Sequence, residues 1–200
     1  MKKLFLPVLC LILFGFTSDI VKLTEEERNF AVSELTKAKD QLLNTLDGLS
    51  EEQLNFKPDA SSWSIAEGVE HLTISENAFH DMLTASLENP ADPARRSEVK
   101  MQDGQLMDMI RDRTQKVKTS EPFEPSGKFG SYEETLDALL AKRSEHIEYL
   151  KTTEDDLRNH YGQLPFGTID AYQMILFMSG HMDRHVAQMD EVINHEDFPE

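Results

Sequence analysis

Residues 171–188 read AYQMILFMSGHMDRHVAQ and make the most apolar helix available to this chain of 200 residues. From Ala171 to Phe177 the segment is apolar on almost every side, and a helix of that kind belongs in the centre of a protein. The other helices are therefore expected to surround it. This favours an all-α fold in which residues 171–188 are central and buried.

The same segment carries His181 and His185. Positions i and i+4 of an α-helix differ by only ~40° around its axis, so both imidazoles leave the helix from one stripe. Two imidazoles held in this way form half of a divalent metal site. The pattern H-x-x-x-H is short and also arises by chance, so two ordinary histidines, one hydrogen-bonded in the core, remain the alternative.

Capping boxes predict where other helices begin. Thr24 with Glu27 and Ser64 with Glu67 are two of them, and Phe30 begins the apolar stripe of the first helix. Thr168 caps the last helix, and Asp170 complements its positive end. Residues 153–167 are predicted as loop, and no segment has a convincing strand pattern. The sequence thus predicts a helical bundle, with helices before the last one over residues 24–49, 64–87, 105–118 and 131–151.

The first 17 residues resemble an export signal. Lys2 and Lys3 precede an apolar run, residues 4–16, that is about half a membrane span long. We expect cleavage near Thr17 and a periplasmic or extracellular protein with one domain, residues 18–200; an uncleaved anchor is the alternative. Cleavage removes two lysines and the only cysteine, Cys10, so the formal net charge changes from −17 to −19.

This composition excludes several functions for the mature chain. It can form no disulfide and offers no thiolate as nucleophile or metal ligand. A strongly acidic chain repels nucleic acid and anionic lipid headgroups, so we expect neither DNA binding nor stable membrane insertion after cleavage.

The remaining histidines differ in their surroundings. His71 lies on a semi-apolar face of a core helix and is the best candidate for a third metal ligand, although a core histidine in an ordinary hydrogen bond is the alternative. His80 follows nine residues later and points ~180° away. Three others lie in polar contexts and are predicted at the surface: His146, His160 and His195.

The last helix also argues against one class of enzyme. Metalloproteases of the H-E-x-x-H type carry their general base directly after the first histidine. Met182 occupies that position here, and Asp183 points ~160° away from His181. A protease of that type is disfavoured.

Several short motifs follow one another along nearly the whole mature chain. They are Leu164-Pro165-Phe166-Gly167-Thr168, Ala171-Tyr172-Gln173, His181-x-x-Arg184-His185-x-x-Gln188, Ser62-Trp63-Ser64-Ile65-Ala66-Glu67, Glu70-His71-Leu72, Pro125-x-Gly127-x-Phe129 and Arg143. Taken together, these motifs resemble the DinB-like superfamily.

The resemblance implies a four-helix bundle with a long crossover, here with one extra short helix. It also implies that the second and last helices face each other and that His71, His181 and His185 hold a metal ion. Characterised relatives include metal-dependent thiol transferases and a maleylpyruvate isomerase; others are described as hydrolases, and many are dimers. The export signal departs from the cytoplasmic thiol-using members, which argues against a small thiol as substrate.

The leading hypothesis is an exported metal-dependent enzyme, a hydrolase or thiol transferase, acting on a small molecule. Zinc or nickel on the three histidines would activate a water molecule or a substrate thiol. Gln188 and Glu67 are candidates to support the ligands, although Glu67 also fits a capping box. The alternatives are a non-catalytic bundle that binds metal or a partner, and a metal-free bundle that is purely structural or dimeric.

Overall fold

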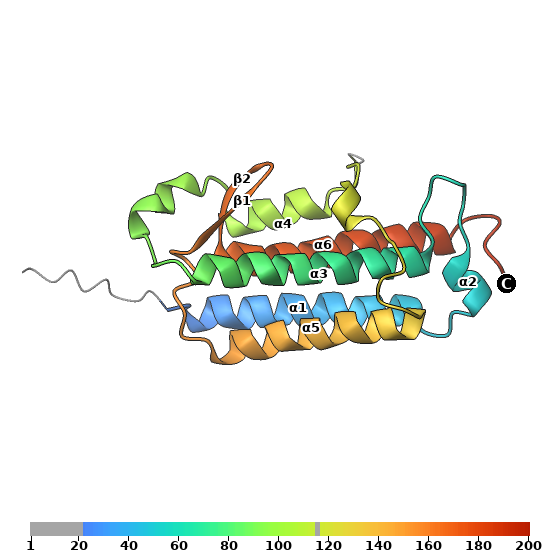
Figure 1. Ribbon diagram of the computed structural model, residues 1–200, viewed down its shortest axis with the longest axis horizontal. Coiled ribbons are helices and arrows are strands. Elements are labelled where there is room, and N and C mark those ends of the chain that lie inside the picture. The colour runs from blue at the N-terminus through green and yellow to red at the C-terminus, as the bar shows by residue number, and fades with distance from the viewer. Residues whose placement is uncertain (1–21, 115–116) are drawn as a thin grey trace, which may run out of the picture.

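The computed structural model describes residues 22–114 and 117–200, so the expected export signal at residues 1–17 lies outside the described residues. Figure 1 shows a bundle of long helices with shorter elements beside it. In chain order, the elements are α1 (Glu25–Leu46), α2 (Glu51–Asn55), α3 (Ile65–Leu87), the 3₁₀-helix η1 (Pro93–Glu98), α4 (Asp103–Arg111), the 3₁₀-helix η2 (Glu121–Phe123), α5 (Tyr132–Thr152), β1 (Tyr161–Leu164), β2 (Gly167–Asp170) and α6 (Ala171–Ile193).

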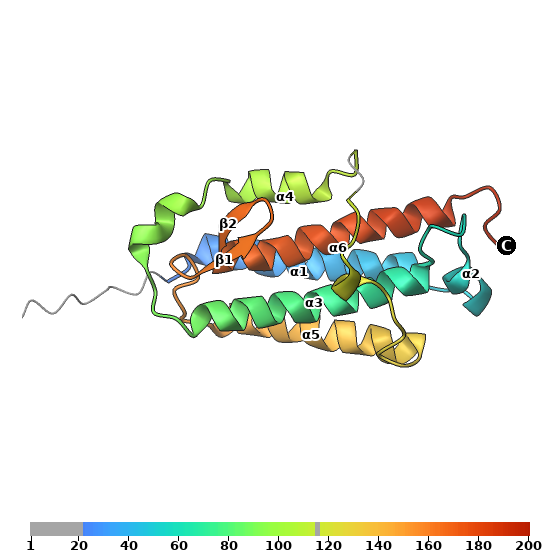
Figure 2. The ribbon, with the colours of Figure 1, turned by 45° about the horizontal axis from the view of Figure 1, so that its top comes forward.

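In the described part of the chain, the four-helix bundle consists of α1, α3, α5 and α6. Helix α6 packs against both α1 and α3, and α5 packs against the same two helices. Although α3 and α5 follow each other in the bundle, they run in the same direction (Figures 1 and 2). The connection between them, residues 88–131, therefore has to return along the molecule, and it carries α4, which packs on α6. The fold is thus the four-helix bundle with a long crossover that the motifs imply.

The helix starts follow the predicted capping boxes. The Thr24 hydroxyl accepts the backbone N–H of Glu27 at 3.1 Å, and the Ser64 hydroxyl accepts that of Glu67 at 3.2 Å. These bonds satisfy N–H groups that have no partner within a helix. The first helix ends at Leu46, earlier than predicted, and Gly48 follows it with a φ of +74°, a conformation that glycine adopts without strain.

Two predicted features of the connections are wrong. Residues 161–170 form a two-stranded antiparallel hairpin in which Leu164 pairs with Gly167. Thr168 lies in β2, where its hydroxyl bonds Gln163, so it cannot cap α6. Asp170 is the cap instead, because its carboxylate accepts the backbone N–H of Gln173 at 2.7 Å. Strands of four residues are too short to show a clear alternation of apolar and polar positions.

The core lies along α6. Met174 and Met182 are both fully buried, Met174 with the apolar side chains near the hairpin and Met182 with those near α2. The burial of two residues differs from the prediction. Phe30, predicted in the buried stripe of the first helix, is 45% exposed, whereas its neighbour Ala31 is one of the residues that α1 buries. His146 is buried because its imidazole bonds a buried carboxylate, that of Glu76.

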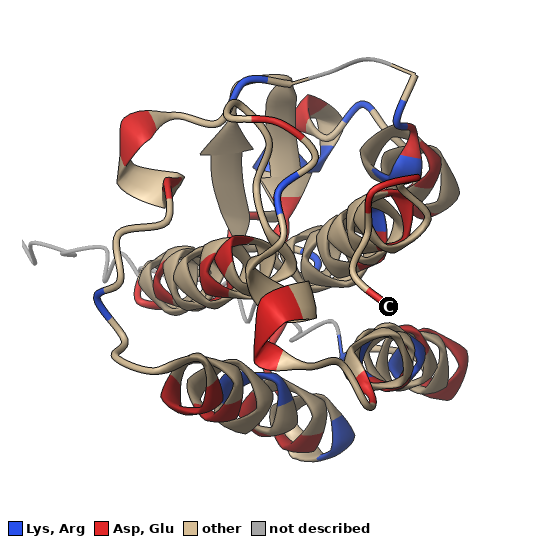
Figure 3. Cartoon of the chain, turned by 90° about the vertical axis from the view of Figure 1, so that its right-hand side faces the viewer, with Lys and Arg blue, Asp and Glu red and all other residues tan. Residues whose placement is uncertain are grey.

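Charged residues lie over the outside of the bundle. In Figure 3, Lys and Arg positions are interspersed with Asp and Glu positions along the helices and loops drawn. Among residues 22–114 and 117–200, no helix is both long enough and apolar enough to cross a membrane.

Candidate metal centre

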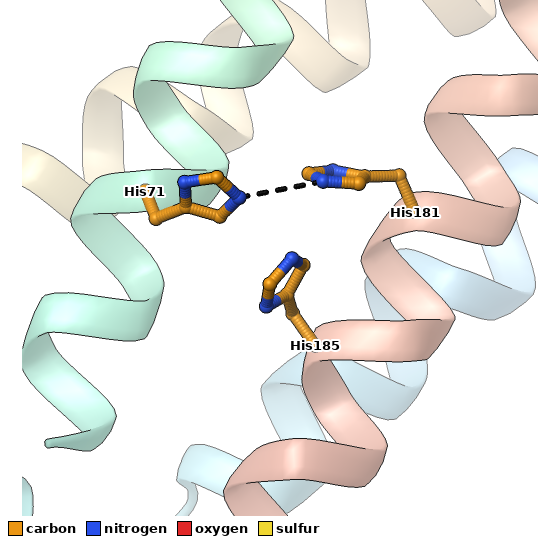
Figure 4. Close-up of side chains that lie close together, drawn as sticks. All are labelled: His71, His181 and His185. Atoms are coloured by element: carbon orange, nitrogen blue, oxygen red, sulfur yellow. Dashed lines mark hydrogen bonds between the residues drawn. The ribbon is translucent and has the colours of Figure 1, made fainter. Parts of the chain in front are cut away.

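Three histidines from two helices converge inside the bundle. His71 comes from α3, and His181 and His185 leave α6 from one stripe and face it (Figure 4). One ring nitrogen of each lies within 4.8 Å of those of the other two. In the described part of the chain, these are the residues whose spacing suits a metal ion. The structure thus brings together the three histidines that the resemblance implies.

The separation of the nitrogens fits a tetrahedral ion. The Nε2 atoms of His71 and His181 are 3.3 Å apart. Metal–nitrogen bonds of about 2.0–2.1 Å at tetrahedral angles place two ligand nitrogens ~3.3–3.4 Å apart. Without an ion, the same distance suits a hydrogen bond in which one ring donates to the other. Little rearrangement is therefore needed for a metal ion to bind.

Hydrogen bonds at the back of two rings orient their free nitrogens. His71 Nδ1–H donates to the carbonyl oxygen of Phe123 at 2.8 Å, and His185 Nδ1–H donates to Oε1 of Gln188 at 3.1 Å. Because a carbonyl oxygen only accepts, Nδ1 carries the proton and Nε2 keeps its lone pair. This is the support that ligating histidines usually have. Gln188 therefore contacts one of the candidate ligands, His185.

The electrostatic environment keeps the imidazoles neutral. Burial lowers the pKa of His71, and burial together with the neighbouring rings lowers the pKa of His181 well below its usual value. For His185, burial first and then His71 lower the pKa to about 3. Neutral imidazole is the form that binds a metal ion. The cluster can therefore accept a divalent cation at neutral pH without first releasing protons.

Aromatic side chains enclose the histidines. The Trp63 ring lies 4.8 Å from that of His71, between ring centres, and 6.2 Å from that of His185. On the other side, Phe79 and Phe177 each lie 5.8 Å from His181. A small cavity of about 10 Å³ beside His185 has room for no more than about one water molecule.

The loop that holds His71 in place is itself anchored by an acidic residue whose role could not be predicted from the sequence. Glu70 is buried, and its Oε1 accepts the backbone N–H of Ser126 at 3.0 Å and that of Lys128 at 3.1 Å. These bonds hold the segment that follows Phe123. The position of Glu70 beside His71 was visible in the sequence, but its partners lie more than 50 residues away.

Glu67 has a different part in the structure. One of its oxygens accepts the backbone N–H of Ser64 in the capping box, and the other pairs with Lys57 at 2.8 Å. Its carboxylate is thus engaged at the start of α3 rather than with His71. This agrees with the capping interpretation of the sequence.

A second buried polar cluster joins α3 and α5. Both oxygens of Glu76 accept hydrogen bonds from Arg143, at 2.8 and 2.7 Å, and Oε1 also accepts Nδ1–H of His146 at 2.9 Å. Nε2 of His146 lies 3.1 Å from Nδ1 of His80. His80 therefore points away from the three candidate metal ligands, as predicted. His160 and His195 are half-buried and lie outside both clusters.

Comparisons with known proteins agree with this architecture. The sequence profile of the DinB superfamily matches residues 34–189. YuaE, an uncharacterized protein of Bacillus subtilis strain 168, is 29% identical over 164 residues, which cover 80% of this chain and 96% of YuaE. YfiT from Bacillus subtilis, described as a probable metal-dependent hydrolase with an unusual four-helix bundle topology, superimposes with a TM-score of 0.58. That likeness covers 88% of this chain and 91% of YfiT at 16% identity, so it shows the fold alone. Because the family profile extends from α1 to α6, the chain belongs to the DinB superfamily.

Proposed function

We propose that this protein is a metal-dependent hydrolase that holds zinc or nickel on His71, His181 and His185. The observation that carries the proposal is the convergence of three neutral imidazoles, two of which have their Nε2 atoms 3.3 Å apart. The description of YfiT as a probable metal-dependent hydrolase on the same fold supports the choice of reaction. Imidazole ligands suit both zinc and nickel.

The side chains around the site each have a task in such a reaction. When bound, a divalent ion supplies Lewis-acid activation of a water molecule or a substrate carbonyl. The Phe123 carbonyl and Gln188 hold two ligand rings in orientation, and Trp63 excludes solvent from one side. The described residues include no cysteine, so a protein thiolate cannot serve as nucleophile there.

Metal content is the first test. The purified full chain is freed of metal and titrated with zinc and with nickel, and bound metal is measured by mass spectrometry and calorimetry. We expect stoichiometric binding that His181→Ala and His185→Ala abolish. His195→Ala is the matched control, because His195 is half-buried near the end of the chain and outside the cluster. Negligible metal uptake would rule the proposal out.

Activity is the second test. The zinc and nickel forms are assayed against esters, amides and lactones, and against a thiol paired with an electrophile. We expect hydrolysis that is lost with the metal ligands. Thiol transfer without hydrolysis would place the protein with the other enzymes that the resemblance suggests.

A non-catalytic metal-binding bundle is the second candidate. The observation in its favour is the small size of the cavity beside His185, about 10 Å³, which admits no organic molecule. It predicts metal uptake without turnover of any substrate class. Both candidate functions predict metal uptake, so only the activity assay distinguishes between them.

Export and self-association belong to the same proposal. We infer that residues 1–17 direct export and are then removed, because Lys2 and Lys3 precede an apolar run. Mass spectrometry of protein expressed with its leader is expected to give a chain that starts near Ser18. Sedimentation analysis of that chain would test for the homodimer that is common among the relatives it resembles.

A further inference from the structure

A row of aromatic rings leads from the candidate metal ligand His181 to the surface. The ring of His181 is stacked on Phe177, with ring centres 5.8 Å apart and planes 17° apart. Phe177 is stacked in turn on Phe166, at 5.9 Å and 14°. Phe79 supports the row from α3, with its ring centre 4.7 Å from that of Phe177. We call Phe166, Phe177 and Phe79 the aromatic row.

Exposure increases along this row. Phe79 is buried, Phe177 is half-buried, and Phe166 is 40% exposed. His181 is half-buried, whereas His71 and His185 are only 4% and 8% exposed. By the surface of the whole residue, His181 is the most accessible of the three histidines, and it is the ring that the aromatic row contacts.

The hairpin holds Phe166 in this exposed place. The residue lies in the turn between β1 and β2, and Gly167 after it has a φ of +141°, a backbone conformation that favours glycine. Strand β1 contacts α3 and α6, so the turn is fixed against the bundle. The exposed ring of Phe166 is thereby held beside Phe177, the ring that is stacked on His181.

Two cavities formed by described residues lie away from the aromatic row. The space beside His185 measures about 10 Å³ and lies on the side of Trp63. A larger groove, about 590 Å³, lies between α1 and α6 and is lined by charged residues such as Glu34 and Asp183 rather than by the three histidines. Neither of these cavities is lined by His181 or Phe177, which are both half-buried and lie on another side of the three histidines.

We propose that the aromatic row is the subsite for the non-reacting part of the substrate, and that this part is a neutral, flat aromatic group. The inference rests on the proposed function, because the reacting group would lie at the histidines. The three rings carry no charge, and Phe166 presents about two fifths of its surface to a ligand. A flat ring can stack on Phe166 and Phe177 while its attached polar group reaches His181.

Two hydroxamates that differ in one group provide the test. Acetohydroxamate and benzohydroxamate chelate a metal ion through the same atoms, but only the second carries an aromatic ring. Their affinities for the zinc-loaded full chain are measured by calorimetry. We expect benzohydroxamate to bind about 10-fold more tightly, which is the size of effect that a stacked aromatic pair and its buried area produce.

Variants locate the effect. Phe166→Ala is expected to reduce the preference for benzohydroxamate to about 2-fold or less, with Phe166→Leu in between, while acetohydroxamate affinity stays unchanged. Because Phe166 is 40% exposed and lies in a turn outside the buried core, its replacement leaves the core intact. Phe30→Ala is the matched control: Phe30 is 45% exposed on α1 and should leave both affinities unchanged.

The outcomes separate the two proposals. A chain that takes up neither zinc nor nickel overturns the proposed function and this inference with it. Zinc uptake with equal affinity for both hydroxamates overturns this inference alone. An equal preference in wild type and Phe166→Ala also overturns it. The inference is also overturned if the wild-type chain is a dimer and Phe166→Ala is a monomer that keeps the preference for benzohydroxamate. The aromatic row would then be a contact between two copies of the chain.

Discussion

A single hydrogen bond within α6 sets the orientation of His185. Gln188 lies three residues after it on the same helix, and its Oε1 accepts Nδ1–H at 3.1 Å. This contact depends only on helical spacing, so both residues could be selected from the sequence. It explains how the buried ring of His185 keeps one defined tautomer.

Removing this bond should weaken metal binding without unfolding the protein. We expect Gln188→Ala to lower zinc affinity about 10–100-fold, because supporting groups of this kind typically contribute that much. Competition with a chromophoric chelator measures the affinity. Gln41→Ala is the control, since Gln41 is exposed on α1. An unchanged zinc affinity in Gln188→Ala would show that the bond has no part in metal binding.

Glu76 is the buried charge on which the contact between α3 and α5 depends. Arg143 and His146 both donate to it, and all three side chains are almost inaccessible to solvent. Breaking a buried ion pair by removing one partner leaves the other charge uncompensated, at a cost of about 3–5 kcal/mol. We therefore expect Glu76→Gln to lower the free energy of unfolding by about that amount at pH 7, measured in urea.

The same residue predicts a dependence on pH. Burial tends to raise the pKa of Glu76, but Arg143 and His146 outweigh it and lower the pKa below the ordinary value of 4.5. A carboxylate with a lowered pKa stabilises the fold above the unfolded pKa, and this contribution is lost as pH falls through the folded pKa. The difference between wild type and Glu76→Gln should therefore shrink below pH 4.5. Glu88→Gln, at an exposed position after α3, should show no such difference.

At the level of elements, a loop is fastened to α3 by the residue next to His71. Glu70 accepts N–H groups of Ser126 and Lys128, and the carbonyl of Phe123 in the same segment orients His71. The long crossover is therefore part of the candidate site and not only a connection.

Releasing this loop should affect His71. We expect Glu70→Ala to speed amide hydrogen exchange in residues 123–130 and to lower zinc affinity, because the carbonyl that holds Nδ1 becomes less well placed. Exchange is followed by mass spectrometry. Glu124→Ala is the control, since Glu124 is exposed in the same segment. Slow exchange in Glu70→Ala, equal to that of wild type, would contradict this role.

The elements also show how far local sequence patterns reach. The starts of α1, α3 and α5 could be predicted because each capping box lies within four residues. The hairpin could not, since two strands of four residues are not stable alone and form here against α3 and α6. Asp170 caps α6, because Thr168 lies in strand β2 and its hydroxyl bonds Gln163.

For the whole molecule, a bound ion should stabilise the bundle. The candidate ligands come from α3 and α6, so the three of them can bind one ion together only in the folded chain. At 100 times the dissociation constant, binding adds about 2.7 kcal/mol. We expect zinc to raise the Tm by about 5–10 °C for a chain of this size. The shift should be retained in His195→Ala and lost in His185→Ala; equal shifts in both would mean that zinc binds elsewhere.

The sequence by itself determined the properties that depend on neighbours along a helix. The apolar character of α6 predicted its central position, and the spacing of His181 and His185 placed them on one stripe. The acidic composition and the absence of cysteine after residue 10 were equally direct. These properties hold for any fold in which the segment is helical.

Only the tertiary structure decided which distant groups join them. His71 is 110 residues from His181, and the Phe123 carbonyl lies 52 residues from His71. His146 was predicted at the surface, but it is buried, because it bonds the buried carboxylate of Glu76, 70 residues away in the sequence. The physical reason is that helical periodicity places side chains around one axis only. Which helices then meet, and at what height, is set by the path of the crossover and by packing of the core.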